Sequence, residues 1–260
     1  MNVQSNLLPN LRREKILELL KEDGSAKVVN LAKIFKVTVA TIRQDLEKLE
    51  KEGLVVREHG GVYLKNIEDQ VRAFLLAQQD NLDKKERIAR KCVEFIESGD
   101  TIILDSGSTT TEIAKKLTNI KNLTVITNAL NIALMLGANP NIEVVMTGGE
   151  FKRPTLSLTG QKAADFFSGL NVQKLFLATA GISLKSGLTY PSISDLVVKQ
   201  AMIQAADTTY LVADSTKIGK SAFASLGALS LIDYIITDSG IEEKHKQVFK
   251  DNDIELIIAE

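Results

Sequence analysis

The residues best suited to chemistry are four consecutive hydroxyl side chains, Ser108 to Thr111, which follow the tripeptide Asp105-Ser106-Gly107. An apolar run predicts a strand that ends at Leu104, and a helical pattern follows from Glu112. A loop between a strand and a helix offers free backbone N–H groups, hydroxyl donors and the positive end of a helix dipole, which together bind phosphate. Capping of the helix needs only one such hydroxyl. We therefore predict an anion site formed by Asp105, Ser106, Gly107, Ser108, Thr109 and Thr110.

Other predicted strands also end in small polar residues. These loops contain Thr127-Asn128, Thr147-Gly148-Gly149, Ala180-Gly181 and Asp214 to Lys217. Ligands of open α/β sheets bind beyond the carboxyl ends of the strands. Lys217 would supply a cation there, and Asp105 and Asp214 would accept sugar hydroxyls; the alternatives are a solvated lysine and aspartates that cap turns. The predicted ligand site therefore also includes Thr127, Asn128, Gly148, Gly149, Gly181 and Lys217.

Alternating strand and helix patterns dominate the chain from residue 83 onward. One helix is predicted over residues 84–97, with Cys92 on its apolar side as a buried structural thiol, and another over residues 112–117. Strands separated by helices form βαβ units and a mostly parallel sheet, so we expect a Rossmann-like α/β fold. The predicted strands are 101–104, 124–127, 143–146, 174–179, 209–213, 234–237 and 255–258.

Three short helices and a hairpin are predicted in residues 1–65. The helices cover 11–22, 28–35 and 39–52, with Thr38 as the N-cap of the third, and the hairpin surrounds Gly60-Gly61. This is the pattern of a winged helix-turn-helix, in which Arg43 can pair with guanine and Gln44 with adenine. The alternative is a domain that binds another protein. The predicted DNA-binding residues are Thr38, Ala40, Thr41, Arg43, Gln44, Lys48, Arg57, His59 and Gly60.

Composition and charge fit a DNA-binding protein with an acidic body. Of the 260 residues, 44% are hydrophobic and 25% are charged, which is ordinary for a globular protein. Residues 1–65 hold 12 basic and nine acidic side chains, so positive charge gathers at the end predicted to face phosphates. The single cysteine excludes an internal disulfide, no apolar run reaches the roughly 18 residues of a membrane span, and the first residues lack a signal peptide's apolar core. We therefore expect a cytoplasmic protein.

Both halves of the sequence carry the motifs of one family. Residues 12–20, 31–35, 41–46 and 59–61 follow the patterns R-x-x-x-I-L-x-L-L, L-A-x-x-F, T-I-R-R-D-L and a G-G wing. The second half shows D-x-G-S-T-T, T-N, G-G, G-L-T and D-S-[ST]-K-x-G in this order. In these motifs the chain resembles the DeoR family of bacterial transcriptional regulators. It departs from the family pattern at Gln44, where a second arginine is usual, at Asp195, where glutamate is usual, and at Ile218, where phenylalanine is common.

The resemblance implies a repressor of a sugar-metabolism operon. Its parts would be a DNA-binding domain (1–65), a linker (66–82) and a phosphosugar-sensing domain (83–260) of the kind found in ribose-phosphate isomerases. The expected partners are double-stranded operator DNA, a phosphorylated sugar effector and further copies of the chain in a homo-oligomer, with no metal, cofactor or membrane. The residues that the resemblance assigns to the effector are Ser108, Thr109 and Thr110, with Asp105, Asn128 and Lys217 nearby.

The main alternative is a sugar-phosphate isomerase or deaminase with an appended DNA-binding-like domain. An isomerase needs a positioned base that moves protons between adjacent carbons. His59 lies in the predicted wing and His245 in a late polar helix, so we expect no histidine near the strand-end loops. Asp105, Asp195 and Asp214 remain as candidate bases. A sensor without enzymatic activity is the favoured interpretation.

Overall fold

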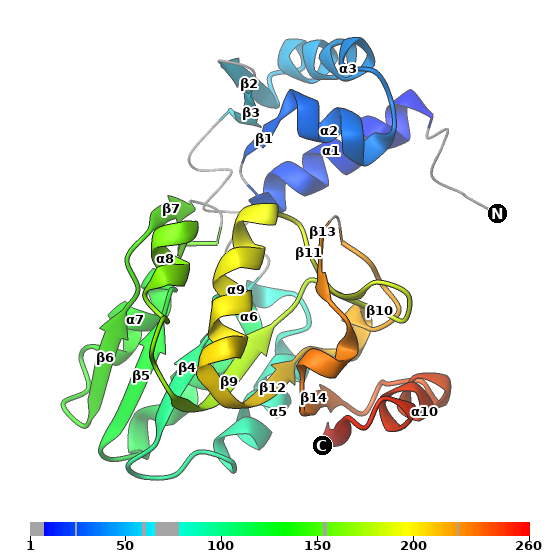
Figure 1. The fold of residues 1–260 in the computed structure, drawn as a ribbon. Coiled ribbons are helices and arrows are strands. Elements are labelled where there is room, and N and C mark those ends of the chain that lie inside the picture. Colours follow the sequence, from blue (N-terminus) through cyan, green and yellow to red (C-terminus); the bar gives the residue numbers. More distant parts are fainter. Residues whose placement is uncertain (1–7, 24, 59–60, 66–77, 153–154, 223) are drawn as a thin grey trace. The chain divides into compact units, whose positions relative to one another are not determined.

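Figure 1 shows the fold of the chain in a computed structural model, which describes residues 8–23, 25–58, 61–65, 78–152, 155–222 and 224–260. The chain forms two compact units, one made of residues 1–77 and 153–155 and the other of residues 78–152 and 156–260. No helix in these described ranges is long and apolar enough to cross a membrane. The predicted linker, 66–82, falls mostly outside the described residues.

The N-terminal unit is a winged helix-turn-helix, which confirms the predicted fold. A three-residue strand, β1, pairs with the wing to give an antiparallel sheet in the order β1-β3-β2. The sequence does not predict β1, because its only strand partner is the distant wing, where Val62 faces Ala26. The elements are α1 (Pro9–Asp23), β1 (Ser25–Lys27), α2 (Val28–Phe35), α3 (Val39–Lys51), β2 (Val55–Glu58) and β3 (Gly61–Leu64).

Local signals set the turn before α3 and the end of that helix. Lys36 ends α2 in the left-handed conformation, with a φ of 51°. Thr38 then caps α3, because its Oγ1 accepts a hydrogen bond from the backbone N–H of Thr41 at 3.1 Å. Gly53 follows α3 with a φ of 75°, a conformation that favours glycine. The core beneath these helices contains the buried residues Ile16, Leu20, Leu31, Ile42, Leu46 and Leu49.

A buried ion pair joins α1 to α3. Oδ2 of Asp45 lies 2.5 Å from Nε of Arg12, and its Oδ1 lies 3.6 Å from Nη1 of Arg13. The side chains of Arg12 and Asp45 are only 8% and 4% exposed. Breaking a buried pair is strongly destabilising, because it leaves a charge in a poorly solvated site. The pair therefore holds α3 in a fixed orientation on α1.

The second unit is a doubly wound α/β domain. Seven parallel strands form one sheet in the order β15-β14-β12-β9-β4-β5-β6, which confirms the predicted parallel sheet. Figure 1 shows helices on both of its faces: Ile103 belongs to the core shared with α8, α9 and α10, and Ile102 to the core shared with α5, α6 and α7. The strands are β4 (Thr101–Leu104), β5 (Leu123–Thr127), β6 (Ile142–Met146), β9 (Val172–Ala178), β12 (Ala206–Val212), β14 (Tyr234–Asp238) and β15 (Glu255–Ala259).

Two predicted helix boundaries in this unit are wrong. The helix predicted over 84–97 ends at Val93, because the N–H groups of residues 94–96 bond to carbonyls three residues back and tighten the chain into a turn. The helix predicted from Glu112 begins at Ser108, because the hydroxyl residues themselves form its first turn. The helices are α5 (Leu82–Val93), α6 (Ser108–Lys116), α7 (Leu130–Leu136), α8 (Gln161–Asp165), α9 (Ile193–Ala205) and α10 (Glu243–Asp251).

Two small antiparallel sheets lie outside the main sheet. β7 (Glu150–Lys152) pairs with β8 (Ser157–Thr159). β10 (Gly181–Ser183), β11 (Gly187–Tyr190) and β13 (Ala224–Gly227) form the other. The sequence does not predict these strands, because three or four residues are too few to show an alternating pattern. β7 follows β6 and β10 follows β9, so both small sheets begin just beyond the carboxyl ends of main-sheet strands.

Replacement of Asp45 tests the buried ion pair. Asp45→Ala removes the carboxylate from the buried guanidinium of Arg12, and should lower the free energy of unfolding of the N-terminal unit by about 3 kcal/mol or more. Glu47→Ala is the control, because the pair of Glu47 with Lys51 is open to solvent and its loss should change little. Urea denaturation of the full chain, followed by circular dichroism, measures both. An equal decrease in the free energy of unfolding in the two variants would show that the buried pair does not hold α3.

Candidate functional site

The order of the strands reverses next to β4. The chain runs from β4 outward through β5 and β6, then returns to the other side of β4 to build β9, β12, β14 and β15. Ligands of open α/β sheets bind at such a reversal, beyond the carboxyl ends of the strands that flank it. These ends are Asp105, which follows β4, and Ala178, the last residue of β9. The hydroxyl-rich segment from Ser106 to Thr111, which we call the hydroxyl loop, therefore begins at the switch point of the sheet.

A buried ion pair occupies the switch point. Nζ of Lys199 on α9 lies 2.7 and 2.6 Å from the two carboxylate oxygens of Asp105, and the backbone N–H of Ala178 donates to Oδ2 at 3.1 Å. Asp105 is fully buried and Lys199 is 5% exposed. Burial raises the pKa of Asp105, and the charge of Lys199 opposes that shift. The carboxylate that the sequence offers to sugar hydroxyls is thus already engaged by Lys199, a residue that the predicted site does not contain.

Tyr190 lies against this ion pair. Nζ of Lys199 is 4.8 Å from the centre of the Tyr190 ring, and the phenol donates to a carbonyl at the end of β9 at 2.8 Å. Burial raises the pKa of Tyr190, and the charges of Asp105 and Asp195 raise it further. Asp195, one turn before Lys199 on α9, pairs with Lys152 of β7 at 2.7 Å. Two ion pairs therefore lie close to Tyr190, and the second ties α9 to the β7–β8 hairpin.

The hydroxyl loop contains both structural and available groups. The hydroxyls of Thr110 and Thr111 donate to the carbonyl oxygen of Gly107 at 3.0 and 2.7 Å, so both stabilise the first turn of α6. The first N–H groups of α6 have no acceptor within the helix, and a phosphate needs such donors. Thr110 can therefore offer a ligand its backbone N–H but not its hydroxyl proton. Hydroxyls without a hydrogen-bond partner in the described part of the chain remain on Ser106, Ser108 and Thr109.

Gly107 allows the loop to lie against β9. A Cβ atom at this position would be 2.6 Å from the Cβ of Ala178, which is closer than side-chain carbons approach. The φ of Gly107 is 177°, an extended conformation open to any residue. Space, rather than backbone conformation, therefore requires glycine here, and it brings the start of α6 next to the Asp105–Lys199 pair.

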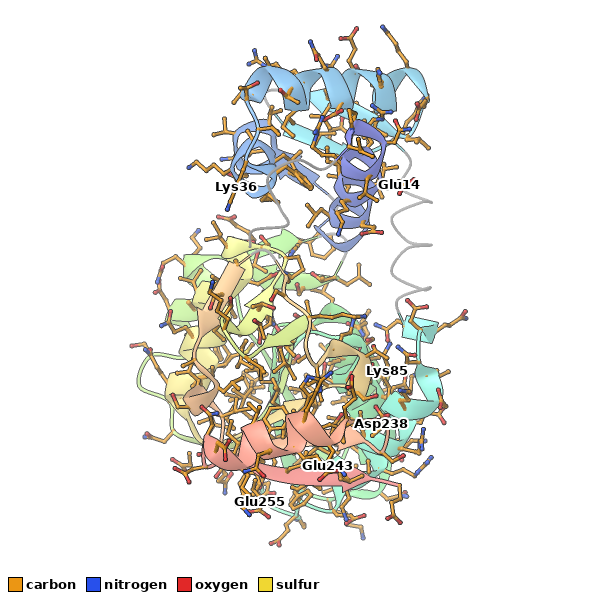
Figure 2. The ribbon with its side chains drawn as sticks, turned by 90° about the vertical axis from the view of Figure 1, so that its right-hand side faces the viewer. Glu14, Lys36, Lys85, Asp238, Glu243 and Glu255 are labelled. Atoms are coloured by element: carbon orange, nitrogen blue, oxygen red, sulfur yellow. The ribbon has the colours of Figure 1, made fainter. Side chains whose placement is uncertain are left out.

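Two lysines supply positive charge on this edge of the unit. Lys217, in a 3-10 turn after β12, is half-buried and makes no ion pair with any described residue. Lys85 on α5 is buried; burial lowers its pKa, the charge of Lys217 lowers it further, and Asp214 opposes both effects. Figure 2 labels Lys85 and Asp238; the carboxylate of Asp238 pairs with Lys84, the residue before Lys85, at 3.1 Å. Two lysines that repel each other would be stabilised by an anion between them.

The remaining predicted effector residues hold the loops in place. Thr127 donates its hydroxyl to a β4 carbonyl at 2.7 Å. A Cβ at Gly149 or Gly181 would lie 2.7 or 2.8 Å from a backbone oxygen, so both glycines are required by packing, whereas a Cβ at Gly148 would meet no atom within 4 Å. Asn128 donates to a β8 carbonyl at 3.0 Å, and its Oδ1 is buried with no partner in the described ranges. Asn128 is thus the member of this group with an unused polar atom.

The prediction that no histidine lies near these loops is wrong. His245 of α10 is buried, and its Nε2 would be 3.4 Å from a Cβ at Gly219, two residues after Lys217. The N–H of Gly219 in turn donates to the carbonyl of Ile182 in β10 at 2.8 Å. The sequence places His245 in a polar helix but does not show that this helix packs against the loop. Its ring supports the segment that carries Lys217.

Helix α3 presents the predicted readout residues to solvent. Ala40, Arg43, Gln44 and Lys48 are exposed, and Thr41 is half-buried. The side chains of Arg43, Gln44 and Lys48 have no ion pair or hydrogen bond within the described residues. They are therefore available to bases and phosphates. Of the other predicted DNA-binding residues, Thr38 caps α3, Arg57 pairs with Glu50, and His59 and Gly60 lie outside the described residues.

Removal of Lys199 should make stability depend on pH. In Lys199→Met, Asp105 keeps the burial that raises its pKa and loses the cation that opposes the shift. A carboxyl group with a raised pKa in the folded state contributes stability below its unfolded pKa of about 3.9 and loses that contribution as the pH rises through the folded pKa. Relative to wild type, the variant should therefore lose stability from about pH 4 upward, by up to about 1.4 kcal/mol per pH unit.

Thermal unfolding across this pH range measures the effect. The control is the double variant Asp105→Asn/Lys199→Met, which has no carboxyl group to titrate at the switch point and should show no added pH dependence. The same pH dependence in both variants would show that another group is responsible.

Comparisons with known proteins agree with the motifs in both halves. A family model described as the DeoR-like helix-turn-helix domain matches residues 12–68, and one described as the DeoR C terminal sensor domain matches residues 80–239. The chain is 36% identical to the transcriptional regulator YulB of Bacillus subtilis, over 94% of this chain and 95% of that one. It is 31% identical to the glycerol-3-phosphate regulon repressor of Escherichia coli, over 94% and 97% of the two chains. Among solved structures, ribose 5-phosphate isomerase A from Methanocaldococcus jannaschii is 15% identical, with 53% and 55% coverage and a TM-score of 0.40.

Proposed function

We propose that this chain, which belongs to the DeoR family of helix-turn-helix transcriptional regulators, represses a sugar-metabolism operon and binds its operator in a manner modulated by a phosphorylated sugar. The observation that carries the proposal is the hydroxyl loop at the switch point of the sheet. There a helix N-terminus and three hydroxyls without a partner among the described residues lie at the edge of the sheet where α/β proteins bind ligands. A relative named as a regulon repressor supports the proposed repression.

The loop and its surroundings supply what a phosphate requires. The first backbone N–H groups of α6 have no acceptor within the helix, and the helix dipole favours negative charge at that end. The hydroxyls of Ser106, Ser108 and Thr109 add further donors. Lys85 lies within electrostatic range of Glu112 in α6, which places its charge beside the helix that carries the loop.

We infer binding without turnover. A general base needs a free carboxylate or imidazole within reach of the substrate proton. The carboxylates of Asp105 and Asp195 are each engaged by a lysine. Oδ1 of Asp214 accepts hydrogen bonds from both the N–H and the hydroxyl of Thr216, whereas its Oδ2 is buried with no partner among the described residues. Two of the three candidate bases are therefore held in ion pairs and the third is buried, which supports a sensor over an isomerase.

The sensor must act through DNA-binding domains that work in pairs. Helix-turn-helix domains bind pseudo-palindromic sites as symmetric pairs, so we propose that the chain acts in the cytoplasm as a homo-oligomer. Closure of the loops at the carboxyl edge by the effector would change the spacing of the paired domains. Linkage requires effector and DNA to change each other's affinity by the same factor, typically about 5–150-fold.

A thermal-shift screen tests the effector class. The full-length protein is heated with a panel of sugar monophosphates and with the same sugars lacking phosphate. A ligand that binds only the folded state raises the Tm, so we expect a rise with one or two sugar phosphates and none with the free sugars. Thr109→Val removes one donor and should weaken binding about tenfold or more. Thr118→Val makes the same change at an exposed position and should bind as wild type does.

Either of two results would contradict this proposal. A full response in Thr109→Val would mean that the phosphate binds elsewhere. No rise with any sugar phosphate would mean that the effector belongs to another chemical class, while DNA binding by the N-terminal unit would stand.

Arg43→Ala tests base readout by α3. A bidentate contact between arginine and guanine contributes about 1–3 kcal/mol of discrimination, so the variant should lose roughly that much affinity for an operator selected from random DNA. Its affinity for bulk random DNA should fall much less. Arg87→Ala, which removes an arginine paired with Asp83 in α5, controls for the loss of one positive charge. Equal losses on both kinds of DNA would show that Arg43 contacts only phosphate.

A further inference from the structure

The wing arginine that the sequence assigns to DNA is held by an acidic side chain of α3. Nε and Nη2 of Arg57 lie 2.8 and 2.6 Å from Oε2 of Glu50, and the backbone N–H of Arg57 donates to Oε1 at 3.2 Å. β2, which carries Arg57, is an edge strand of its sheet. Its outward N–H groups therefore lack a strand partner, and the carboxylate of Glu50 supplies one.

This ion pair is open to competition from solvent. The side chains of Arg57 and Glu50 are 35% and 36% exposed, in contrast to the buried pair of Arg12 and Asp45. The hydrogen bond from Arg57 lowers the pKa of Glu50, so the carboxylate is charged at neutral pH. A DNA phosphate offers arginine the same bidentate geometry that a carboxylate does. Glu50 and a backbone phosphate are therefore rivals for one guanidinium.

We propose that Glu50 keeps Arg57 from binding the DNA backbone and thereby limits the affinity of the wing for DNA. While the pair is formed, Glu50 neutralises the charge that Arg57 would otherwise present to the phosphates. Exchange of the carboxylate for a phosphate would leave the charged Glu50 beside a polyanion, and the resulting repulsion opposes the exchange. Arg57 thus positions β2 against α3 and makes no phosphate contact in the wild-type protein.

We infer that this arrangement increases the sequence specificity of DNA binding. Phosphate contacts strengthen binding to every DNA sequence alike, whereas base contacts distinguish one sequence from another. Glu50 removes one sequence-independent contact and leaves Arg43 and Gln44 on α3 untouched. A larger share of the binding free energy then comes from base readout.

The number of phosphate contacts can be measured from the salt dependence of DNA binding. The logarithm of the affinity falls with the logarithm of the salt concentration, with a slope of about −0.9 for each phosphate contacted on B-DNA. Glu50→Gln removes the competing charge but keeps an acceptor for the N–H of Arg57. The slope measured on a random-sequence DNA duplex should steepen by about 0.9 per wing, and binding should tighten about eightfold per wing at about 0.1 M salt.

Two further variants separate this effect from a change in net charge. Glu50→Gln/Arg57→Gln replaces the ion pair by neutral side chains and should keep the wild-type slope. Glu52→Gln removes an exposed carboxylate that pairs with no cation in the described part of the chain, and should also keep it. All variants are measured as full-length protein, and their Tm values confirm that they are folded.

Three outcomes would overturn the proposal. An unchanged slope in Glu50→Gln would mean that Arg57 already contacts a phosphate or cannot reach one. An equally steep slope in Glu52→Gln would mean that net charge alone is responsible. Weaker binding by a folded Glu50→Gln would mean that Glu50 orients Arg57 toward DNA instead of holding it back.

Discussion

The ion pair between Asp105 and Lys199 is the constraint on which the rest of the second unit depends. A buried carboxylate is tolerated only when its oxygens are engaged, and here Lys199 contacts both while the N–H of Ala178 binds one. The pair joins the end of β4, the end of β9 and helix α9 where the strand order reverses. The hydroxyl loop starts one residue later, and Gly107 fits it against β9. The place of the loop therefore follows from where two buried charges can neutralise each other.

The sequence predicts the features whose causes are local. Apolar runs between polar loops predict seven strands that match the main sheet, and Thr38 predicts the start of α3 because a cap acts within one turn. Contacts between distant positions are different, since no local pattern records them. Asp105 and Lys199 are 94 positions apart, and each could equally be a solvated residue at a strand or helix end. The three-residue β1 is invisible for the same reason, because its strand character comes from the wing.

The candidate site also contains some features that the sequence predicts and others that only the folded structure shows. The run of hydroxyl residues points to an anion from the sequence alone, but the structure decides which hydroxyls are free: Thr110 and Thr111 turn back onto Gly107. Lys85 occupies an ordinary position in a charged helical segment, and only the packing of α5 in the folded unit buries it. His245 is hidden in a polar helix for a similar reason. Residue type thus predicts what chemistry is possible, and tertiary packing selects the groups that can perform it.

Burial also decides what each ion pair can do. The charged groups of the Asp45–Arg12 and Asp105–Lys199 pairs are buried away from water. Removal of one partner therefore destabilises the fold by about 3–5 kcal/mol. A ligand could take the place of either partner only if the surrounding structure opened. Such pairs fix geometry, and they make α3 and the hydroxyl loop rigid platforms. The exposed Glu50–Arg57 pair keeps its access to water and ions, so a phosphate can compete for the arginine. We propose that affinity for DNA is adjusted at the exposed pair, while the two buried pairs keep helix α3 and the hydroxyl loop in place.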